Sequence, residues 1–224
     1  MGQGIAEVLT FAIGVAISPI PIVAVILMLF SRRARVNGPV FLGGWVVALA
    51  TVSVVAFVLA DQSDPTTSSS ASDTISWGKI VLGVLFLLLA LRNWRKRPAP
   101  GTEPEMPKWM SGIDALSPFQ AFGLGVLLAG VNPKNLVLAV GAAAGVAQLG
   151  LSTGDAAVSL IVFVALASVT IVGPVVYYLL GGQRAQRGLD ALKDWLRIHD
   201  SATMTVLFLV FGVDLIAKGI QPLT

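Results

Sequence analysis

Long apolar stretches follow one another through the sequence, with only short polar segments between them. A helix needs roughly 20 mainly apolar residues to cross the hydrocarbon core of a bilayer. The connecting segments are too short to form a separate soluble domain. We therefore predict an all-α integral membrane protein with six transmembrane helices, over Ile5–Phe30, Pro39–Ala60, Ile75–Leu91, Phe119–Gln148, Asp155–Leu180 and Ala202–Ile220.

The composition excludes most classes of soluble protein. Charged residues make up 12% of the chain, whereas a soluble domain carries about 25%, so the polar residues for a solvated surface are missing. The net charge of +3 does not predict a nucleic-acid partner. The chain has no cysteine and a single histidine, His199, so disulfides, thiolate or histidine metal sites and Ser-His-Asp catalysis lack their residues. We expect no enzymatic activity, no metal and no cofactor.

The basic residues lie mainly in alternate connections. The segments after the first, third and fifth predicted spans hold most of the 15 Lys and Arg residues, whereas segments 61–76 and 149–154 hold none. Cytoplasmic loops carry the excess of Lys and Arg in membrane proteins. We therefore predict a multi-pass protein of the cytoplasmic (inner) membrane, with its basic loops in the cytoplasm and both termini outside. The basic loop residues are Arg32, Arg33, Arg35, Arg92, Arg95, Lys96, Arg97, Lys108, Arg184, Arg187, Lys193 and Arg197.

A proline-rich segment at 93–117 divides the predicted spans into two sets of three, at 1–92 and 118–224. Because each set contains an odd number of spans, the two sets cross the membrane in opposite senses, as inverted repeats do. The sequence therefore predicts two inverted three-helix repeats joined by a cytoplasmic linker. The residues that align between the sets are Pro19 with Pro133 and Gly83 with Gly212.

The two mid-span prolines predict a polar site within the membrane. Proline removes a backbone donor and clashes with the carbonyl four residues back. A freed carbonyl at membrane depth is tolerated only where it faces protein or a water-filled cavity. Paired interruptions in inverted repeats indicate the central site of a transporter, and ordinary packed kinks are the alternative. The predicted substrate-binding residues are Ser18, Pro19, Pro21, Asn132, Pro133, Lys134 and Asn135.

Lys134 lies near the middle of its predicted span, too deep for its side chain to reach the surface fully. A charge at that depth costs about 3 kcal/mol or more, and such residues usually face the interior of the bundle. The ammonium group can hold an anionic head group, exchange a proton, or form a structural ion pair with Asp214. Asp214 can also carry a coupling proton, or pair with Lys218 one helical turn away.

Three further features of the second half concern movement and packing. Gly173-Pro174 predicts a hinge for alternating access or a kink that shapes packing. The GxxxG pattern at Gly141 and Gly145 predicts close helix packing within the bundle. The segment 182–200 predicts a short interfacial helix, with leucines at helical spacing at Leu189, Leu192 and Leu196.

The paired motifs resemble those of the lysine-exporter (LysE) superfamily, and most closely its glycopeptidolipid- and sulfolipid-addressing (GAP or Sap-like) branch. The resemblance rests on Ser18-Pro19-Ile20-Pro21 and Asn132-Pro133-Lys134 and extends over nearly the whole chain. It implies a membrane transporter, typically an exporter, and in this branch one that places complex envelope lipids at the cell surface. The first break lacks the glycine usual in the amino-acid branch. The chain also lacks the membrane cysteines of the thiol-disulfide branch and the acidic residues of the metal branches.

Three functional hypotheses follow. The first is a transporter or exporter of an amphipathic, anionic cell-envelope lipid or glycolipid, which works by alternating access around the paired breaks. The second is an exporter of a small polar metabolite or amino acid. The third is a non-transporting membrane scaffold that assists a lipid-export machine. The expected partners are membrane lipids and the anionic substrate, together with a second copy of the chain or envelope lipid-export machinery.

Overall fold

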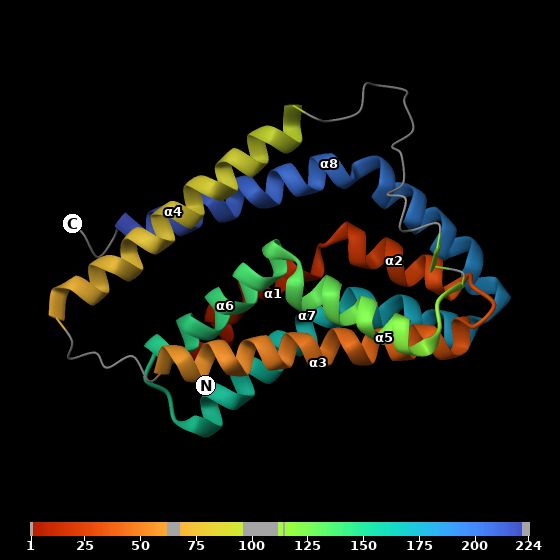
Figure 1. Ribbon diagram of the computed structural model, residues 1–224, viewed down its shortest axis with the longest axis horizontal. Helices are drawn as coiled ribbons and strands as arrows, with labels where there is room; N and C mark the ends of the chain where they lie inside the picture. Colours follow the sequence, from red (N-terminus) through yellow and green to blue (C-terminus); the bar gives the residue numbers. More distant parts are fainter. Residues whose placement is uncertain (1, 62–67, 96–111, 114, 221–224) are drawn as a thin grey trace. The chain divides into compact units, whose positions relative to one another are not determined.

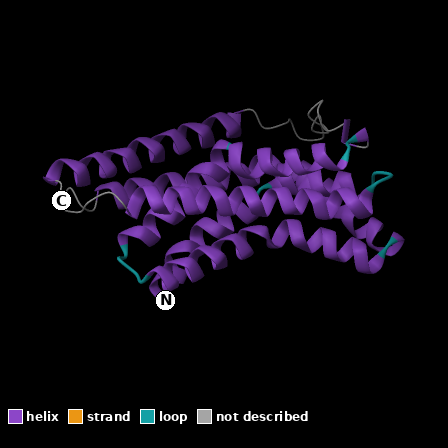
Figure 2. Ribbon diagram, turned by 60° about the horizontal axis from the view of Figure 1, so that its bottom comes forward, coloured by secondary structure: helices purple, strands orange, loops and turns teal. Residues whose placement is uncertain are grey.

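The computed structural model describes residues 2–61, 68–95, 112–113 and 115–220 (Figure 1). The regular structure in this part of the chain is helical throughout, and short loops join the helices (Figure 2). This confirms the all-α prediction for the described residues. The elements in chain order are α1 (Gly2–Ala16), α2 (Pro19–Leu29), α3 (Ala34–Asp61), α4 (Ser68–Arg95), α5 (Pro118–Val126), η2 (Leu127–Val131), α6 (Pro133–Gln148), α7 (Thr153–Gly181) and α8 (Gln183–Ile220).

The lengths and apolar character of these helices fit a multi-pass membrane protein. Among the described residues, α3 and α7 are each long and apolar enough to cross a membrane as single segments. The count rises to at most five when each of three bent helix pairs is taken as one span. Those pairs are α1 with α2, Pro118–Val131 with α6, and Arg184–Leu196 with Ser201–Ala217. The third predicted span coincides with α4, which is not among these candidates.

Several predicted boundaries differ from those in the structure. The fourth helix already begins at Ser68, so part of the predicted connection at 61–76 is helical, and residues 62–67 lie outside the described residues. Most of the predicted linker at 93–117 also lies outside them. The predicted interfacial helix at 182–200 is helical and corresponds to the first part of α8, whose second part corresponds to the last predicted span. The two parts, Arg184–Leu196 and Ser201–Ala217, are the bent pair named above.

The helix starts have local causes. A capping box begins α5: the Ser117 hydroxyl accepts a bond from the Gln120 backbone N–H, and the Gln120 side chain accepts one from the Ser117 N–H. Pro118 occupies the first turn of that helix, where its missing donor costs nothing. Ser152 similarly caps α7 by accepting from the N–H of Asp155.

The described helices belong to two compact units, and each unit combines segments from both halves of the sequence. The first unit contains Met1–Ser63 and Glu105–Arg197, and the second contains Asp64–Pro104 and Ile198–Thr224. The boundaries of the two compact units therefore differ from the predicted division of the chain at 1–92, 93–117 and 118–224. That division concerns chain order and symmetry, and it stays a prediction.

In the first unit, α3 packs against α5 and α6, while α1 packs against α6 and α7. The fully buried side chains of this core include Phe41, Trp45 and Phe163. Where α3 crosses α5, the backbones approach closely. An ideal Cβ atom added to Gly44 would overlap the carbonyl oxygen of Phe122, and one added to Gly125 would overlap that of Phe41. Only glycine permits this separation at both positions.

In the second unit, α4 packs antiparallel to the part of α8 that follows residue 198. Asn93 donates to the carbonyl of Ser201 and to the hydroxyl of Thr205, at 2.7 and 3.2 Å. The rings of Phe86 and Phe208 stack with centroids 5.6 Å apart. Gly83 and Gly212, which align between the predicted repeats, face each other: a Cβ on either would lie within 3.0 Å of the other's carbonyl oxygen.

Candidate functional site at the paired helix breaks

The first break separates α1 from α2, which are bent by 56° relative to each other. Ser18 precedes α2 in an extended conformation, and its buried side chain does not cap the helix. Pro19 and Pro21 follow in the first turn, and both are buried. Since α1 ends at Ala16, the carbonyls of its last turn have no continuing helix to bind them. The predicted break is therefore present, and it creates backbone acceptors that need partners.

The second break separates the π-helical turn η2 from α6, with a bend of 62° between Pro118–Val131 and Pro133–Gln148. Asn132 lies at the break, and its side-chain oxygen accepts from the N–H of Lys134 at 3.1 Å. The Asn132 N–H itself bonds the carbonyl of Leu127 in the wider π register. The carbonyl of Leu128 accepts instead from the side-chain amide of Asn135 at 2.9 Å. Pro133 follows Asn132 at the start of α6 and is exposed.

Two side chains from the second half of the sequence bind the carbonyls of the first break. The ammonium of Lys134, which is only 7% exposed, donates to the carbonyl of Gly14 at 2.8 Å. The hydroxyl of Thr170 on α7 donates to the carbonyl of Ala16 at 2.6 Å. The two breaks are thus joined directly. Lys134 and Thr170, together with the carbonyls of Gly14 and Ala16, form one polar cluster that α1, α6 and α7 build, and the buried Ser18 follows two residues after Ala16.

Sequence reasoning missed Thr170. The fifth predicted span holds several hydroxyl side chains, and spacing alone does not separate them. Ser159 and Ser168 donate to carbonyls one turn earlier on their own helix, Asp155 and Val164. Only the tertiary arrangement shows that Thr170 instead reaches another helix.

The packing of α1 on α6 holds the breaks together. The two helices run antiparallel, with Phe11 of α1 against Gly141 and Glu7 against Gly145. A Cβ on Gly141 would lie 2.8 Å from the Phe11 ring, and one on Gly145 would lie 2.5 Å from the Glu7 carboxylate. The GxxxG pattern therefore packs helices within the chain, which confirms the prediction.

Asn135, which follows Lys134 in the chain, has a second buried polar side chain at the second break. Its side chain is fully buried, and its amide oxygen has no hydrogen-bond partner among the described residues. An unmet buried acceptor costs about 1–3 kcal/mol. A ligand with a hydroxyl or amide donor would remove that cost, while the nearby ammonium would attract an anionic group. Within the described residues, no three His, Cys, Asp or Glu side chains are grouped to hold a metal.

Two parts of the predicted site are not joined to this cluster. Asp214 belongs to the second compact unit and Lys134 to the first, so their ion pair stays a prediction. The side chain of Lys218 lies outside the described residues. The helix α7 continues through Gly173 and the buried Pro174 without a break. A hinge at this position is therefore a prediction about movement.

Replacing Thr170 by valine should lower the free energy of unfolding by about 1–3 kcal/mol, because the Ala16 carbonyl would lose its donor in an apolar interior. Ser168→Ala is the matched control on the same helix. The Ser168 hydroxyl donates a second hydrogen bond to the Val164 carbonyl, one turn back in its own helix. Loss of this hydroxyl should therefore lower the free energy of unfolding by less than about 0.5 kcal/mol. Unfolding in mixed detergent micelles, followed by circular dichroism, measures both. Equal losses would show that the Thr170 contact has no special importance.

The fold and the cluster define a class: a multi-pass, all-helical membrane protein in which two proline-broken helices meet at a buried lysine. The sequence model of the family described as Sap, sulfolipid-1-addressing protein, matches residues 8–221. The chain belongs to this family, as the resemblance to the Sap-like branch predicted. No curated protein and no solved structure matches the chain.

Proposed function

We propose that this protein is a transporter that moves an amphipathic, anionic envelope lipid or glycolipid across the cytoplasmic membrane. In this proposal six spans form two inverted three-helix repeats, with both termini outside and the basic loops in the cytoplasm. The family description supports a lipid substrate, because it refers to the addressing of a sulfolipid. A sulfated head group is an anion, which is the chemistry that a buried ammonium binds.

The observation that carries the proposal is the hydrogen bond from Lys134 to the Gly14 carbonyl, which joins the two breaks. A buried ammonium that binds a neutral carbonyl gains less than one that binds an anion. An anionic head group would therefore compete for Lys134 and loosen the contact between α1 and α6. The two states are one with the contact between Lys134 and Gly14 and one without it, and a head group that binds the second state better shifts the population towards that state. Binding of the head group would in this way be coupled to a rocking of one repeat against the other.

Three residues outside the cluster, Asp214, Gly173 and Pro174, have roles in this proposal. Asp214 would form an ion pair with Lys134 while no substrate is bound and release it when the head group arrives, or it would carry a coupling proton. Gly173-Pro174 would act as the hinge in α7, where proline removes one helix hydrogen bond and so lowers the resistance to bending. The proline that begins the second helix at each break, Pro19 in the first half and Pro133 in the second, supports an inverted-repeat arrangement.

The test is lipid translocation in proteoliposomes that contain the full chain. Fluorescent phosphatidylglycerol, an anionic lipid, should be exchanged between leaflets faster than in protein-free vesicles, and faster than fluorescent phosphatidylcholine. Entrapped radiolabelled lysine and arginine serve as soluble probes. Efflux of an amino acid without lipid movement would instead favour the small-metabolite exporter. No movement of any probe by folded protein would favour the scaffold.

A further inference from the structure

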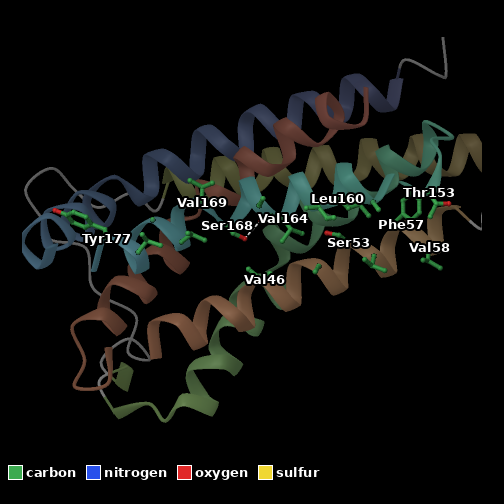
Figure 3. Close-up of a pocket in the computed structure, with 18 of the residues that line it drawn as sticks. Val46, Ser53, Phe57, Val58, Thr153, Leu160, Val164, Ser168, Val169 and Tyr177 are labelled. Atoms are coloured by element: carbon green, nitrogen blue, oxygen red, sulfur yellow. Dashed lines mark hydrogen bonds between the residues drawn. The ribbon is translucent and has the colours of Figure 1, made fainter. Parts of the chain in front are cut away.

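A long groove of about 1260 Å³ lies between α3 and α7 in the first compact unit (Figure 3). Its described lining contains no Asp, Glu, Lys or Arg side chain and consists mainly of Val, Leu, Ile, Ala and Phe. Pockets for drug-sized ligands are usually about 300–1,000 Å³, so the groove is large. The absence of charge from this lining means that it suits an uncharged, apolar occupant.

The shape of the groove is elongated along the helix axes. Its lining residues on α7 extend from Thr153 to Leu180, which corresponds to about 40 Å of helix at 1.5 Å per residue. Those on α3 extend from Val46 to Val58, about 18 Å. The hydrocarbon core of a bilayer is about 30 Å thick. A groove of these proportions accommodates an extended alkyl chain better than a compact metabolite.

One polar group in the groove lacks a partner. Ser53 on α3 is 1% exposed, and its hydroxyl has no hydrogen-bond partner among the described residues. The other helix offers Ser168, whose hydroxyl already donates to the carbonyl of Val164 at 2.7 Å (Figure 3). A buried, unsatisfied hydroxyl is unfavourable in an apolar interior, so a bound acceptor would stabilise it. The ester or amide carbonyl that links an alkyl chain to a head group is such an acceptor.

The groove and the polar cluster share a helix. Thr170 of α7 binds the carbonyl of Ala16 at the first break, while its neighbours Val169 and Val172 line the groove. A lipid whose chains lie along α7 therefore contacts the helix that also binds the first break. This arrangement matches an amphipathic ligand, with an anionic head at the cluster and apolar chains in the groove.

We propose that the groove between α3 and α7 binds the alkyl chains of the transported lipid, and that Ser53 donates a hydrogen bond to the carbonyl of its linkage. This inference rests on the proposed function and narrows the substrate class to lipids with long acyl chains. A small metabolite would leave the groove unused.

Photolabelling of the full chain in vesicles tests the site. The probe is phosphatidylglycerol with a diazirine in its palmitoyl chain, and labelled peptides are mapped by mass spectrometry. Labels should concentrate in residues 46–58 and 153–180. Ala165→Trp, which fills the groove from α7, should lower this labelling about tenfold, the effect of losing contact with about two methylene groups. Val55→Trp adds the same bulk to an exposed position of α3 outside the groove, and it should leave labelling unchanged.

Ser53→Ala gives a second test that does not depend on bulk. The protein without added lipid should unfold at the same or a higher temperature, because a buried hydroxyl without a partner is removed. The ability of phosphatidylglycerol to raise the unfolding temperature should fall, and groove labelling should fall about fivefold, as expected for one lost hydrogen bond. If Ser53→Ala instead lowers the unfolding temperature without lipid and leaves groove labelling unchanged, Ser53 stabilises the folded protein. That result would overturn the proposed hydrogen bond from Ser53 to the lipid.

The outcomes separate this inference from the transport proposal. Labelling spread evenly over exposed helix faces, or insensitive to Ala165→Trp, would overturn the groove site even if the lipid is transported. A dimer that Ala165→Trp dissociates, with no groove labelling in the wild type, would also overturn it and assign the groove to a second copy of the chain. Labelling confined to the groove without lipid movement would support the chain site and contradict transport.

Discussion

Gly44→Ala should lower the free energy of unfolding by about 3 kcal/mol, near the upper end of the range for overpacking. The added methyl group would overlap the carbonyl oxygen of Phe122 on α5. A backbone oxygen in a helix has no rotamer that moves it away, so α3 and α5 must separate. Separation would also loosen the neighbouring contact of Gly125 with Phe41, and Gly125→Ala should have a similar effect.

The chain supplies matched controls for these two substitutions. Gly43 and Gly123 lie on the same helices, and a Cβ atom at either position would have no neighbour within 4 Å. Gly43→Ala and Gly123→Ala should therefore raise stability by up to about 1 kcal/mol, because alanine favours the helix more than glycine does. Unfolding midpoints in mixed micelles and elution by gel filtration provide the comparison. Equal behaviour of Gly43→Ala and Gly44→Ala would mean that the close crossing of α3 and α5 is wrong.

Lys134→Met should reduce translocation of the anionic lipid by about 10- to 100-fold, the usual value of a hydrogen bond to a charged group. Methionine keeps much of the length and apolar volume of lysine but removes the ammonium that holds Gly14 and, in our proposal, the head group. Lys134→Arg keeps the charge on a broader, planar group, so partial activity is expected. Lys193→Met is the control. Its ammonium pairs with Asp190 at 2.7 Å and lies over the ring of Phe30, outside the cluster.

Thr170→Val separates a transport role of Lys134 from a purely structural one. Both substitutions leave a carbonyl of the first break without its donor, but only Lys134→Met removes a charge. If the lysine binds the head group, Lys134→Met should show the predicted 10- to 100-fold loss of translocation while Thr170→Val at equal protein yield largely retains it. Parallel losses in both variants would indicate that capping of the broken backbone is the sole function of Lys134.

The two breaks were predictable in part, because proline lacks the N–H that a continuous helix uses. Pro19 and Pro133 each begin a helix directly after a break, whereas Pro39 and Pro174 lie within the continuous helices α3 and α7, so proline alone does not decide where a helix is interrupted. The internal use of Gly141 and Gly145 was predictable for a similar reason, since small residues one turn apart permit close packing.

The partners of these residues were not predictable. Charge alone suggested Asp214 for Lys134, whereas the described bond of the lysine goes to the Gly14 carbonyl. The sequence does not indicate which backbone carbonyl a side chain binds, because every residue has a carbonyl. The bond of Thr170 to the Ala16 carbonyl was likewise not predictable, nor were the buried side-chain oxygens of Ser53 and Asn135 that lack a hydrogen-bond partner among the described residues. Threonine, serine and asparagine occur at several positions in the apolar spans, and the sequence does not distinguish these positions from the others.

Sequence by itself determined the properties that depend on residue type and order. These are the apolar composition of the chain, the helical character of its described residues, its paired proline breaks, and the family to which it belongs. Tertiary structure decided which groups satisfy the broken backbone, where α3 and α7 enclose a groove, and how segments from both halves form each compact unit. The physical reason is that a freed carbonyl or an apolar face must find a partner, and only the folded arrangement determines which distant segment provides it.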